Sequence, residues 1–235
     1  MTKRDCKIEQ LIVSRCNREA YNALFECLKN EREEGKAYIL KGPHSSGKSM
    51  LLNCLANEFK QQHPKSNIYI ETGESIVCRL IESYNAKKGA PQLIAEECDI
   101  LIIEDVDFLA GKNATLQWLG GVLNNHIKKG TIVVISCNSR VRGLECMDNE
   151  IESVEHLFVK EADRELRYRL ISQKLDEKQM VLKPRAIRHL AGSRLSVSQI
   201  IGLIKTLVFV NEILDEPITM RQYKKIYAQF EKQVR

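Results

Sequence analysis

The stretch that decides the fold is ILKGPHSSGKSMLLNCL, residues 39–55. It begins with apolar residues typical of a buried strand, passes through a loop bounded by Gly42 and Gly47, and ends in the start of a helix. The loop fits the pattern G-x-x-x-x-G-K-[ST], in which backbone N–H groups turn inward around phosphate oxygens. Because the match lies between a strand and a helix, as this mechanism requires, we expect a bound polyphosphate here.

Specific roles are expected of the residues in this loop. Lys48 should reach the β and γ phosphates, and the Ser49 hydroxyl should bind Mg²⁺. The full set of expected phosphate-loop contacts is Gly42, Pro43, His44, Ser45, Ser46, Gly47, Lys48, Ser49 and Met50.

Polar residues at the ends of two later strands complete the expected site. Glu104 and Asp105 follow an apolar strand and would lie at its carboxyl end, where α/β sheets bind ligands. We expect Glu104 to hold Mg²⁺ and Asp105 to orient an attacking water, although paired acids at a strand end are also common as surface loops. Asn138 follows the next strand and is expected beside the γ-phosphate, although a lone Asn there is usually a turn residue.

The order of elements predicts the fold class. Strands are predicted at 37–40, 67–70, 99–103, 131–136 and 156–159, and helices between them at 17–30, 48–62, 74–84, 91–97 and 114–128. This alternation favours an α/β core with a mainly parallel sheet and helices on both faces. Only helices follow, at 162–177, 184–191, 197–213 and 219–233. We therefore expect a core at 1–160 and a small all-helical lid at 161–235.

Composition excludes several classes of protein. The 235 residues carry a net charge of +5 and are 43% hydrophobic, which suits one α/β unit with an appendage. No run approaches the roughly 18 unbroken apolar residues of a membrane helix, and no secretory signal is recognisable, so we expect a cytoplasmic protein without a membrane partner. The eight cysteines form no C-x-x-C pair and are expected to be reduced thiols.

These motifs together resemble the AAA+ ATPases, and among them the ATPase domain of the bacterial replication initiator DnaA and its short relatives such as Hda. The resemblance rests on SRCNREAYNAL (14–24), IIEDVDFLAGK (102–112) and EPITMRQYKKI (216–226). It implies ATP or ADP with Mg²⁺ as cofactors. It also implies that Ile12 and Val13 contact adenine, and that Asn17 belongs to the nucleotide-binding residues.

The chain departs from the family pattern at the arginines that promote hydrolysis. Glu150 and Val154 stand where the family has arginines that reach a neighbouring subunit's nucleotide, and Ser198 stands at the position of the lid arginine. Three nearby arginines could substitute from shifted positions: Arg140, Arg142 and Arg194. Glu104 also replaces the first of two aspartates, and no duplex-reading domain is recognisable before Arg235. We therefore expect weak ATPase activity at most.

The resemblance implies a stand-alone DnaA-like ATP-binding protein that acts in, or regulates, chromosomal replication initiation. Expected partners are other replication proteins, above all the AAA+ protein DnaA, with the sliding clamp or the replicative helicase as further candidates. Weak contacts to single-stranded DNA are expected through Arg79, Lys87 and Lys88. The alternative is a helicase loader, which an N-terminal helicase-binding domain would indicate. A competent motor and a small-molecule kinase fit the arginine pattern and the acidic motif less well.

Overall fold

The computed structural model describes residues 8–28, 35–85, 94, 97–151, 153–214 and 216–234. The chain divides into two compact units. The first comprises Met1–Leu11 and Asn17–Lys160, and the second comprises Ile12–Cys16 and Glu161–Arg235. The short segment Ile12–Cys16 therefore belongs to the same unit as the C-terminal helices. The predicted core at 1–160 contained this segment.

The first unit is built on a five-stranded sheet in the order β2-β3-β4-β1-β5. Every adjacent pair of strands is parallel, which confirms the prediction of a parallel sheet. The strands are β1 (Ala37–Gly42), β2 (Ile68–Thr72), β3 (Ile100–Glu104), β4 (Ile132–Asn138) and β5 (Val154–Phe158). Because all the strands run the same way, the loops that follow β1, β3 and β4 leave from one edge of the sheet.

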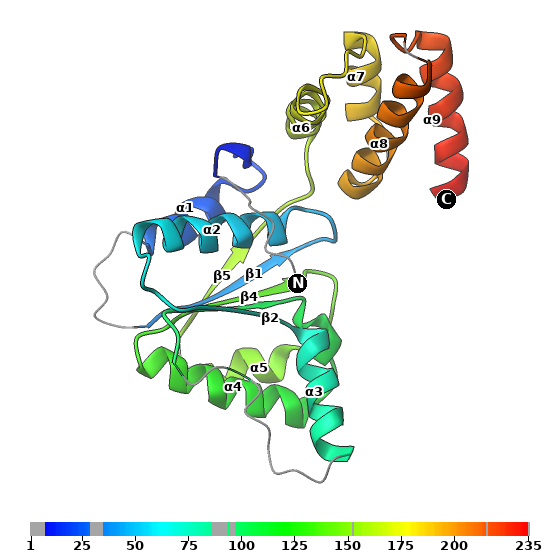
Figure 1. Ribbon diagram of the computed structural model, residues 1–235. Coiled ribbons are helices and arrows are strands. Elements are labelled where there is room, and N and C mark those ends of the chain that lie inside the picture. Colours follow the sequence, from blue (N-terminus) through cyan, green and yellow to red (C-terminus); the bar gives the residue numbers. More distant parts are fainter. Residues whose placement is uncertain are drawn as a thin grey trace. The chain divides into compact units, whose positions relative to one another are not determined.

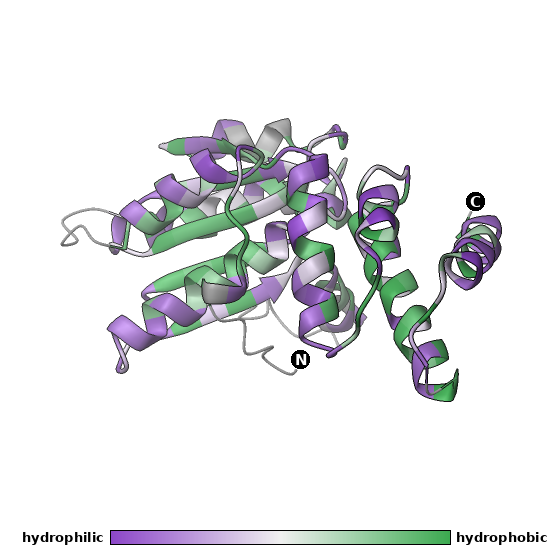
Figure 2. Cartoon of the chain, turned by 90° about the horizontal axis from the view of Figure 1, so that it is seen from above, coloured by the Kyte–Doolittle hydropathy of each residue, from purple (hydrophilic) through white to green (hydrophobic). Residues whose placement is uncertain are grey.

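Helices cover both faces of this sheet (Figure 1), as the sequence predicted. The helices α1 (Arg18–Glu26) and α2 (Lys48–Gln62) lie on one face, and α3 (Gly73–Asn85), α4 (Asn113–Lys128) and the short α5 (Glu145–Glu150) lie on the other. Two short 3-10 helices complete the unit, η1 (Ile8–Gln10) and η2 (Val106–Leu109). Figure 2 shows mostly hydrophobic strands between helices with hydrophilic outer surfaces.

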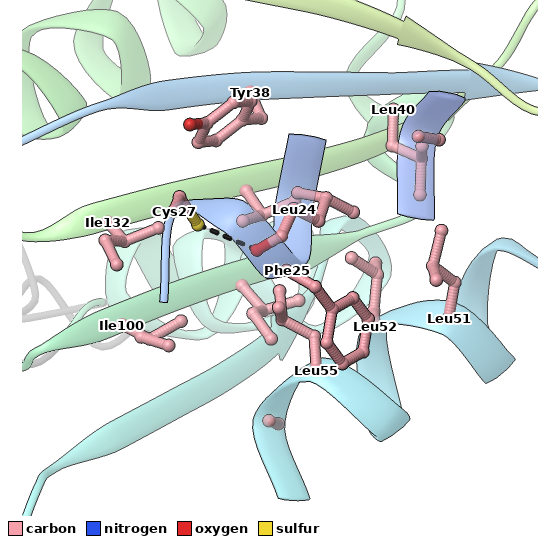
Figure 3. Packing of buried hydrophobic residues seen from close by; sticks show 14 of the residues in the cluster. Leu24, Phe25, Cys27, Tyr38, Leu40, Leu51, Leu52, Leu55, Ile100 and Ile132 are labelled. Atoms are coloured by element: carbon pink, nitrogen blue, oxygen red, sulfur yellow. Dashed lines mark hydrogen bonds between the residues drawn. The ribbon is translucent and has the colours of Figure 1, made fainter. Parts of the chain in front are cut away.

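Alternation along each strand supplies the two cores. In β1, Tyr38 and Leu40 face α1 and α2, whereas Ala37 and Ile39 face α4. Figure 3 shows the first core, where Leu24 and Phe25 pack with Leu51, Leu52 and Leu55 against the strands. Both faces of β1, β3 and β4 are buried, so these three strands read as nearly continuous apolar runs in the sequence.

The second unit contains the helices that follow residue 160, as predicted. They are α6 (Arg164–Asp176), α7 (Pro184–Ala191), α8 (Val197–Leu214) and α9 (Met220–Val234). Local side-chain bonds begin three of them. The Asp163 carboxylate accepts the Leu166 N–H at the start of α6, while Ser196 with Gln199, and Thr219 with Gln222, form capping boxes before α8 and α9.

Helix α8 is long and apolar enough to cross a membrane, judged by length and composition alone, within the part of the chain that the structure describes. Lys205 and Glu212 interrupt the apolar residues of α8, so it contains no unbroken apolar run of the kind sought in the sequence. Its Ile200, Leu203 and Leu207 are buried in the core of the second unit. Core helices of soluble proteins pass the same test, so the finding is weak evidence for a membrane span.

Most predicted elements match the structure within two residues, and α2 and α7 match at both ends. The 3-10 helices and α5 were not predicted. The predicted helix at 91–97 falls mostly outside the described residues. The two residues of this range that the structure describes, Ile94 and Glu97, lie in bends. Cysteines at positions 16, 27, 54, 78, 98 and 137 are free thiols, in line with the expectation of reduced cysteines.

Candidate nucleotide-binding site

The phosphate loop joins the end of β1 to the first residue of α2. Gly47 has a φ of 99°, a left-handed conformation, and directly precedes Lys48, the first helical residue. A Cβ at Gly47 would meet no atom within 4 Å, so its conformation and not lack of space favours glycine there. The first N–H groups of α2 have no partner within the helix, which makes this turn a suitable anion site.

Gly42 is required for a different reason. A Cβ built on Gly42 would lie 2.5 Å from the carbonyl oxygen of Val159 and 2.9 Å from the Ser46 Oγ. The chain after β5 therefore passes directly against the start of the phosphate loop. The Ser46 hydroxyl is buried here and has no hydrogen-bond partner among the described residues.

Lys48 lies inside the loop that it follows. Lys48 is only 7% exposed, and its Nζ donates to the carbonyl oxygens of Gly42 at 2.9 Å and Pro43 at 3.1 Å. The ammonium group is thus held within the concave side of the loop, where the β and γ phosphates are expected. His44, by contrast, is exposed at the tip of the loop.

The structure brings Ser49 and Glu104 together. The Ser49 hydroxyl, in the first turn of α2, donates a hydrogen bond to the Glu104 carboxylate at the end of β3. Burial raises the pKa of the Glu104 carboxyl above its usual range, and the nearby Asp105 adds to the rise, while the Ser49 hydrogen bond and the Lys48 charge oppose it. A hydroxyl and a carboxylate oxygen side by side are ligands that Mg²⁺ accepts.

Asp105 takes an unusual backbone conformation. Its φ of 51° and ψ of 54° are left-handed, which few residues other than Gly, Asn and Asp adopt easily. Its N–H donates to the Ser136 Oγ at 3.1 Å, and its carboxylate makes no capping bond to η2. Ser136 is fully buried on β4, so a polar group of one strand fixes the residue that follows another. Ser136 was not predicted from the sequence to belong to the site.

Asn138 ends β4 directly beside Gly42, its parallel partner in β1. Its backbone N–H donates to both carboxylate oxygens of Asp107, at 2.9 and 3.1 Å, and its Oδ1 accepts the N–H of Arg140 at 3.0 Å. Asn138 is therefore a turn residue as well as a neighbour of the phosphate loop. Asp107 was also missed from sequence, and its signal was a third acid two residues after Asp105.

Ile12 and Val13, which are expected to contact adenine, belong to the second unit, where the Val13 carbonyl oxygen accepts from Arg169 at 3.3 Å. Asn17, which is expected among the nucleotide-binding residues, is buried in the first unit, and its carbonyl oxygen accepts the Tyr21 N–H in α1. The roles of these three residues in nucleotide binding stay predictions.

Glu150, Val154 and Ser198 stand where the family has arginines, and the structure shows where each of them lies. A Cβ at Gly120 in α4 would lie 2.5 Å from the Glu150 Cβ, so Glu150 packs closely on that helix, and its carbonyl oxygen accepts from Asn124. Val154 begins β5, and Ser198 lies in the first turn of α8. Of the possible substitutes, Arg140, Arg142 and Arg194 are all exposed or in exposed turns.

Arg79, which is expected to contact single-stranded DNA, is paired with an acid in the structure. Its guanidinium forms a salt bridge with Glu71 and lies within hydrogen-bond distance of the Tyr69 hydroxyl. A contact between Arg79 and a DNA phosphate stays a prediction. Lys87 and Lys88 lie outside the described residues.

Comparison with known proteins places this geometry in context. The model of the bacterial DnaA ATPase domain matches residues 2–158. The chromosomal replication initiator protein DnaA of Zymomonas mobilis is 26% identical over 219 residues, which cover 90% of this chain and 45% of that protein. DnaA of Caulobacter sp. strain K31 is 31% identical over 146 residues, which cover 58% and 29%. The chain spans about half the length of the curated relatives it matches along most of its length.

Solved structures show the same fold. Domain III of the Thermotoga maritima replication initiation protein DnaA aligns with a TM-score of 0.84 at 21% identity, covering 96% of this chain and 97% of that one. A replication initiator DnaA bound to AMPPCP and single-stranded DNA aligns with a TM-score of 0.72 at 18% identity, covering 99% and 70%. The match of the family model to most of the chain, together with this fold, shows that the chain belongs to the bacterial DnaA ATPase domain family.

Proposed function

We propose that this chain binds ATP or ADP with Mg²⁺ at the phosphate loop and acts as a nucleotide-dependent component of chromosomal replication initiation. The observation that carries the proposal is the placement of Lys48 inside the loop, next to the hydrogen-bonded pair Ser49 and Glu104. The relative with AMPPCP in its structure gives independent support for an adenine nucleotide.

Ser49 and Glu104 are the residues proposed to hold Mg²⁺. No group of three or more His, Cys, Asp and Glu side chains forms a metal site within the described parts of the chain. Mg²⁺ does not require such a group, because the ion usually takes one or two protein ligands and completes its shell with water and substrate phosphates. When bound, it would neutralise charge on the β and γ phosphates.

Asp105 and Asn138 are proposed to act at the γ-phosphate. The Asp105 carboxylate would accept a proton from a water molecule and orient it for attack. The Oδ1 of Asn138 already accepts from Arg140, so the Asn138 side chain offers its NH₂ group, which is a donor suited to a phosphate oxygen.

Hydrolysis by the chain alone is proposed to be slow. Charge that develops on the transferred phosphoryl group is normally stabilised by an arginine, which contributes about 10³ to 10⁵ in rate. Glu150, Val154 and Ser198 cannot supply that charge. We therefore propose that the nucleotide mainly serves as a switch, and that a second AAA+ replication protein of the DnaA type reads it and can supply an arginine. A cytoplasmic location follows from this proposed role.

Titration calorimetry with ATP and ADP, with and without Mg²⁺, tests the binding. Lys48→Ala should weaken ATP binding at least about tenfold, since it removes a charged contact to the phosphates. The matched control is Lys65→Ala, which removes the same charge from an exposed turn beyond the other end of α2. Equal ATP affinity of the Lys48→Ala variant and the wild type would refute the proposed site.

A further inference from the structure

Asp107 is an acidic residue next to the proposed site for which no role has been given above. It lies in η2, two residues beyond Asp105, and is only partly exposed. Both of its carboxylate oxygens are within hydrogen-bond distance of the Asn138 backbone N–H, at 2.9 and 3.1 Å. A bond from a backbone N–H to a charged carboxylate is stronger than a bond between neutral groups.

The position of this bond in the sheet explains why it is needed. The pairing of β3 with β4 ends at Ile103 and Ile135, whereas β4 continues to Asn138. On its other side Asn138 is already paired with Gly42 of β1. Its N–H therefore extends beyond the last partner that β3 offers, and the Asp107 carboxylate takes the place of the missing strand.

Two more hydrogen bonds join the segment after β3 to β4 and to the loop that follows β4. The Asp105 N–H donates to the Ser136 Oγ at 3.1 Å, and the Gly111 N–H donates to the Gly143 carbonyl oxygen at 3.0 Å. The segment after β3 is thus bonded to β4 at two residues and to the following loop at one. The Asp107 bond is the one that reaches Asn138 itself.

The side chain of Asn138 is fixed at the same time. With its Oδ1 bonded to the Arg140 N–H and its backbone N–H bonded to Asp107, both the position and the amide orientation of Asn138 are set. The NH₂ group is then the donor that Asn138 presents. A donor held in place discriminates better than a mobile one, because no side-chain entropy is lost on binding.

We propose that Asp107 is a positioning residue that lets this chain distinguish ATP from ADP. It holds Asn138 so that the NH₂ group meets the γ-phosphate, which ADP lacks. The proposal rests on the proposed nucleotide binding at the phosphate loop. Asp107 acts only through Asn138, so contacts to the α and β phosphates are unaffected by its loss.

The test measures ATP and ADP affinities of the wild type and of Asp107→Ala, Asp107→Asn and Glu82→Ala, by calorimetry with Mg²⁺. The wild type should bind ATP more tightly than ADP. Asp107→Ala should lower the ATP:ADP affinity ratio about tenfold, the value of one hydrogen bond to a charged phosphate, and change ADP affinity less than about twofold. Asp107→Asn keeps one oxygen acceptor and should restore most of the ratio.

Glu82→Ala, which removes an exposed acid of α3, is the control for lost negative charge and should leave the ratio unchanged. An unchanged ratio in folded Asp107→Ala protein would overturn the proposal, as would equal losses for ATP and ADP with a lowered Tm. If Asp107→Ala does not fold, Asp107→Glu, which displaces the carboxylate by one methylene, should lower the ratio in its place. A wild type that binds neither nucleotide refutes the proposed function itself, whereas a wild type that binds both equally refutes only the role of Asp107.

Discussion

The hydroxyl of Ser49 lies beside the carboxylate of Glu104, where its hydrogen bond lowers the pKa of that carboxyl, and this contact joins the start of α2 to the end of β3. The two strands are not neighbours, because β4 lies between them in the sheet. The contact is therefore made across the carboxyl ends of the strands by α2, which passes over the sheet. It brings two oxygen ligands together in a position that neither strand could supply alone.

Nucleotide binding is expected to depend on pH through Glu104. Because the pKa of its carboxyl is raised, the group takes up a proton at a higher pH than an ordinary glutamate and then no longer binds Mg²⁺ well. The Mg²⁺-dependent part of the ATP affinity should fall as the pH is lowered through the raised pKa of Glu104, before the ordinary glutamate range is reached. Calorimetry on Glu104→Gln should show a smaller Mg²⁺ effect that does not change with pH.

Glu104→Gln should weaken the Mg²⁺ effect on ATP binding but increase the stability of the folded protein. A carboxyl whose pKa is higher in the folded state favours folding when protonated, and this advantage is lost as the pH rises through the raised pKa. Glu104→Gln should therefore have a higher Tm than the wild type at neutral pH, with the difference shrinking at acid pH. A lower Tm at neutral pH would show that the Ser49 bond outweighs the cost of burial.

Two adjacent glycines of α4 should respond in opposite ways to alanine. A Cβ at Gly120 would lie 2.5 Å from the Glu150 Cβ, so Gly120→Ala must displace α5 and should cost about 1–3 kcal/mol. A Cβ at Gly121 meets nothing within 4 Å, and Gly121→Ala should stabilise the helix by up to about 1 kcal/mol. Urea unfolding of both variants checks the prediction, which fails if the two free-energy changes have the same sign.

The second unit should lose stability when Asp163 is replaced. The Leu166 N–H and then the Arg15 guanidinium lower the pKa of its carboxyl, so its contribution is present above the ordinary aspartate range and is lost as the pH falls through the lowered pKa. Asp163→Ala should destabilise the start of α6 by about 1 kcal/mol at neutral pH. Asp163→Asn keeps the cap and should cost less. The comparison is made by urea unfolding at neutral and acid pH.

Turnover of ATP by the purified chain should be slow and independent of its concentration. Without an arginine at 150, 154 or 198, phosphate release should be on the order of 10⁻² per second or below. Steady-state assays over a wide range of protein concentration measure this. Faster release that rises with concentration would mean that Arg140, Arg142 or Arg194 completes the site of a second copy, and alanine variants of the three would identify which.

The sequence was most informative where local pattern and burial agree. The phosphate loop predicted the start of α2, and the apolar runs of β1, β3 and β4 predicted the parallel sheet, because buried strands need little context to be recognised. The left-handed Asp105 and the bond from Asn138 to Asp107 could not be predicted in the same way. Both depend on groups contributed by a neighbouring strand, and a linear pattern does not show which strands are adjacent.

The ion pair of Arg79 could not be predicted for a related reason. Glu71 lies near the end of β2 and Arg79 lies in α3, which follows at once, and the sequence does not indicate that they form a salt bridge. The positive charge of Arg79, which the sequence suggests is available to a phosphate, is paired with the Glu71 carboxylate in the fold. Positions of charged residues predict a binding surface only after such internal pairs are removed.

The assignment of Ile12–Cys16 to the second unit has a consequence for how that unit is made. During synthesis this segment leaves the ribosome early, whereas its partners Asp163 and Arg169 emerge only after residues 17–160. The helices after residue 160 therefore form these contacts with a segment, Ile12–Cys16, that was synthesised much earlier. A fragment that begins at Glu161 lacks Arg15 and the Val13 carbonyl group, and so would be an unfinished version of the unit.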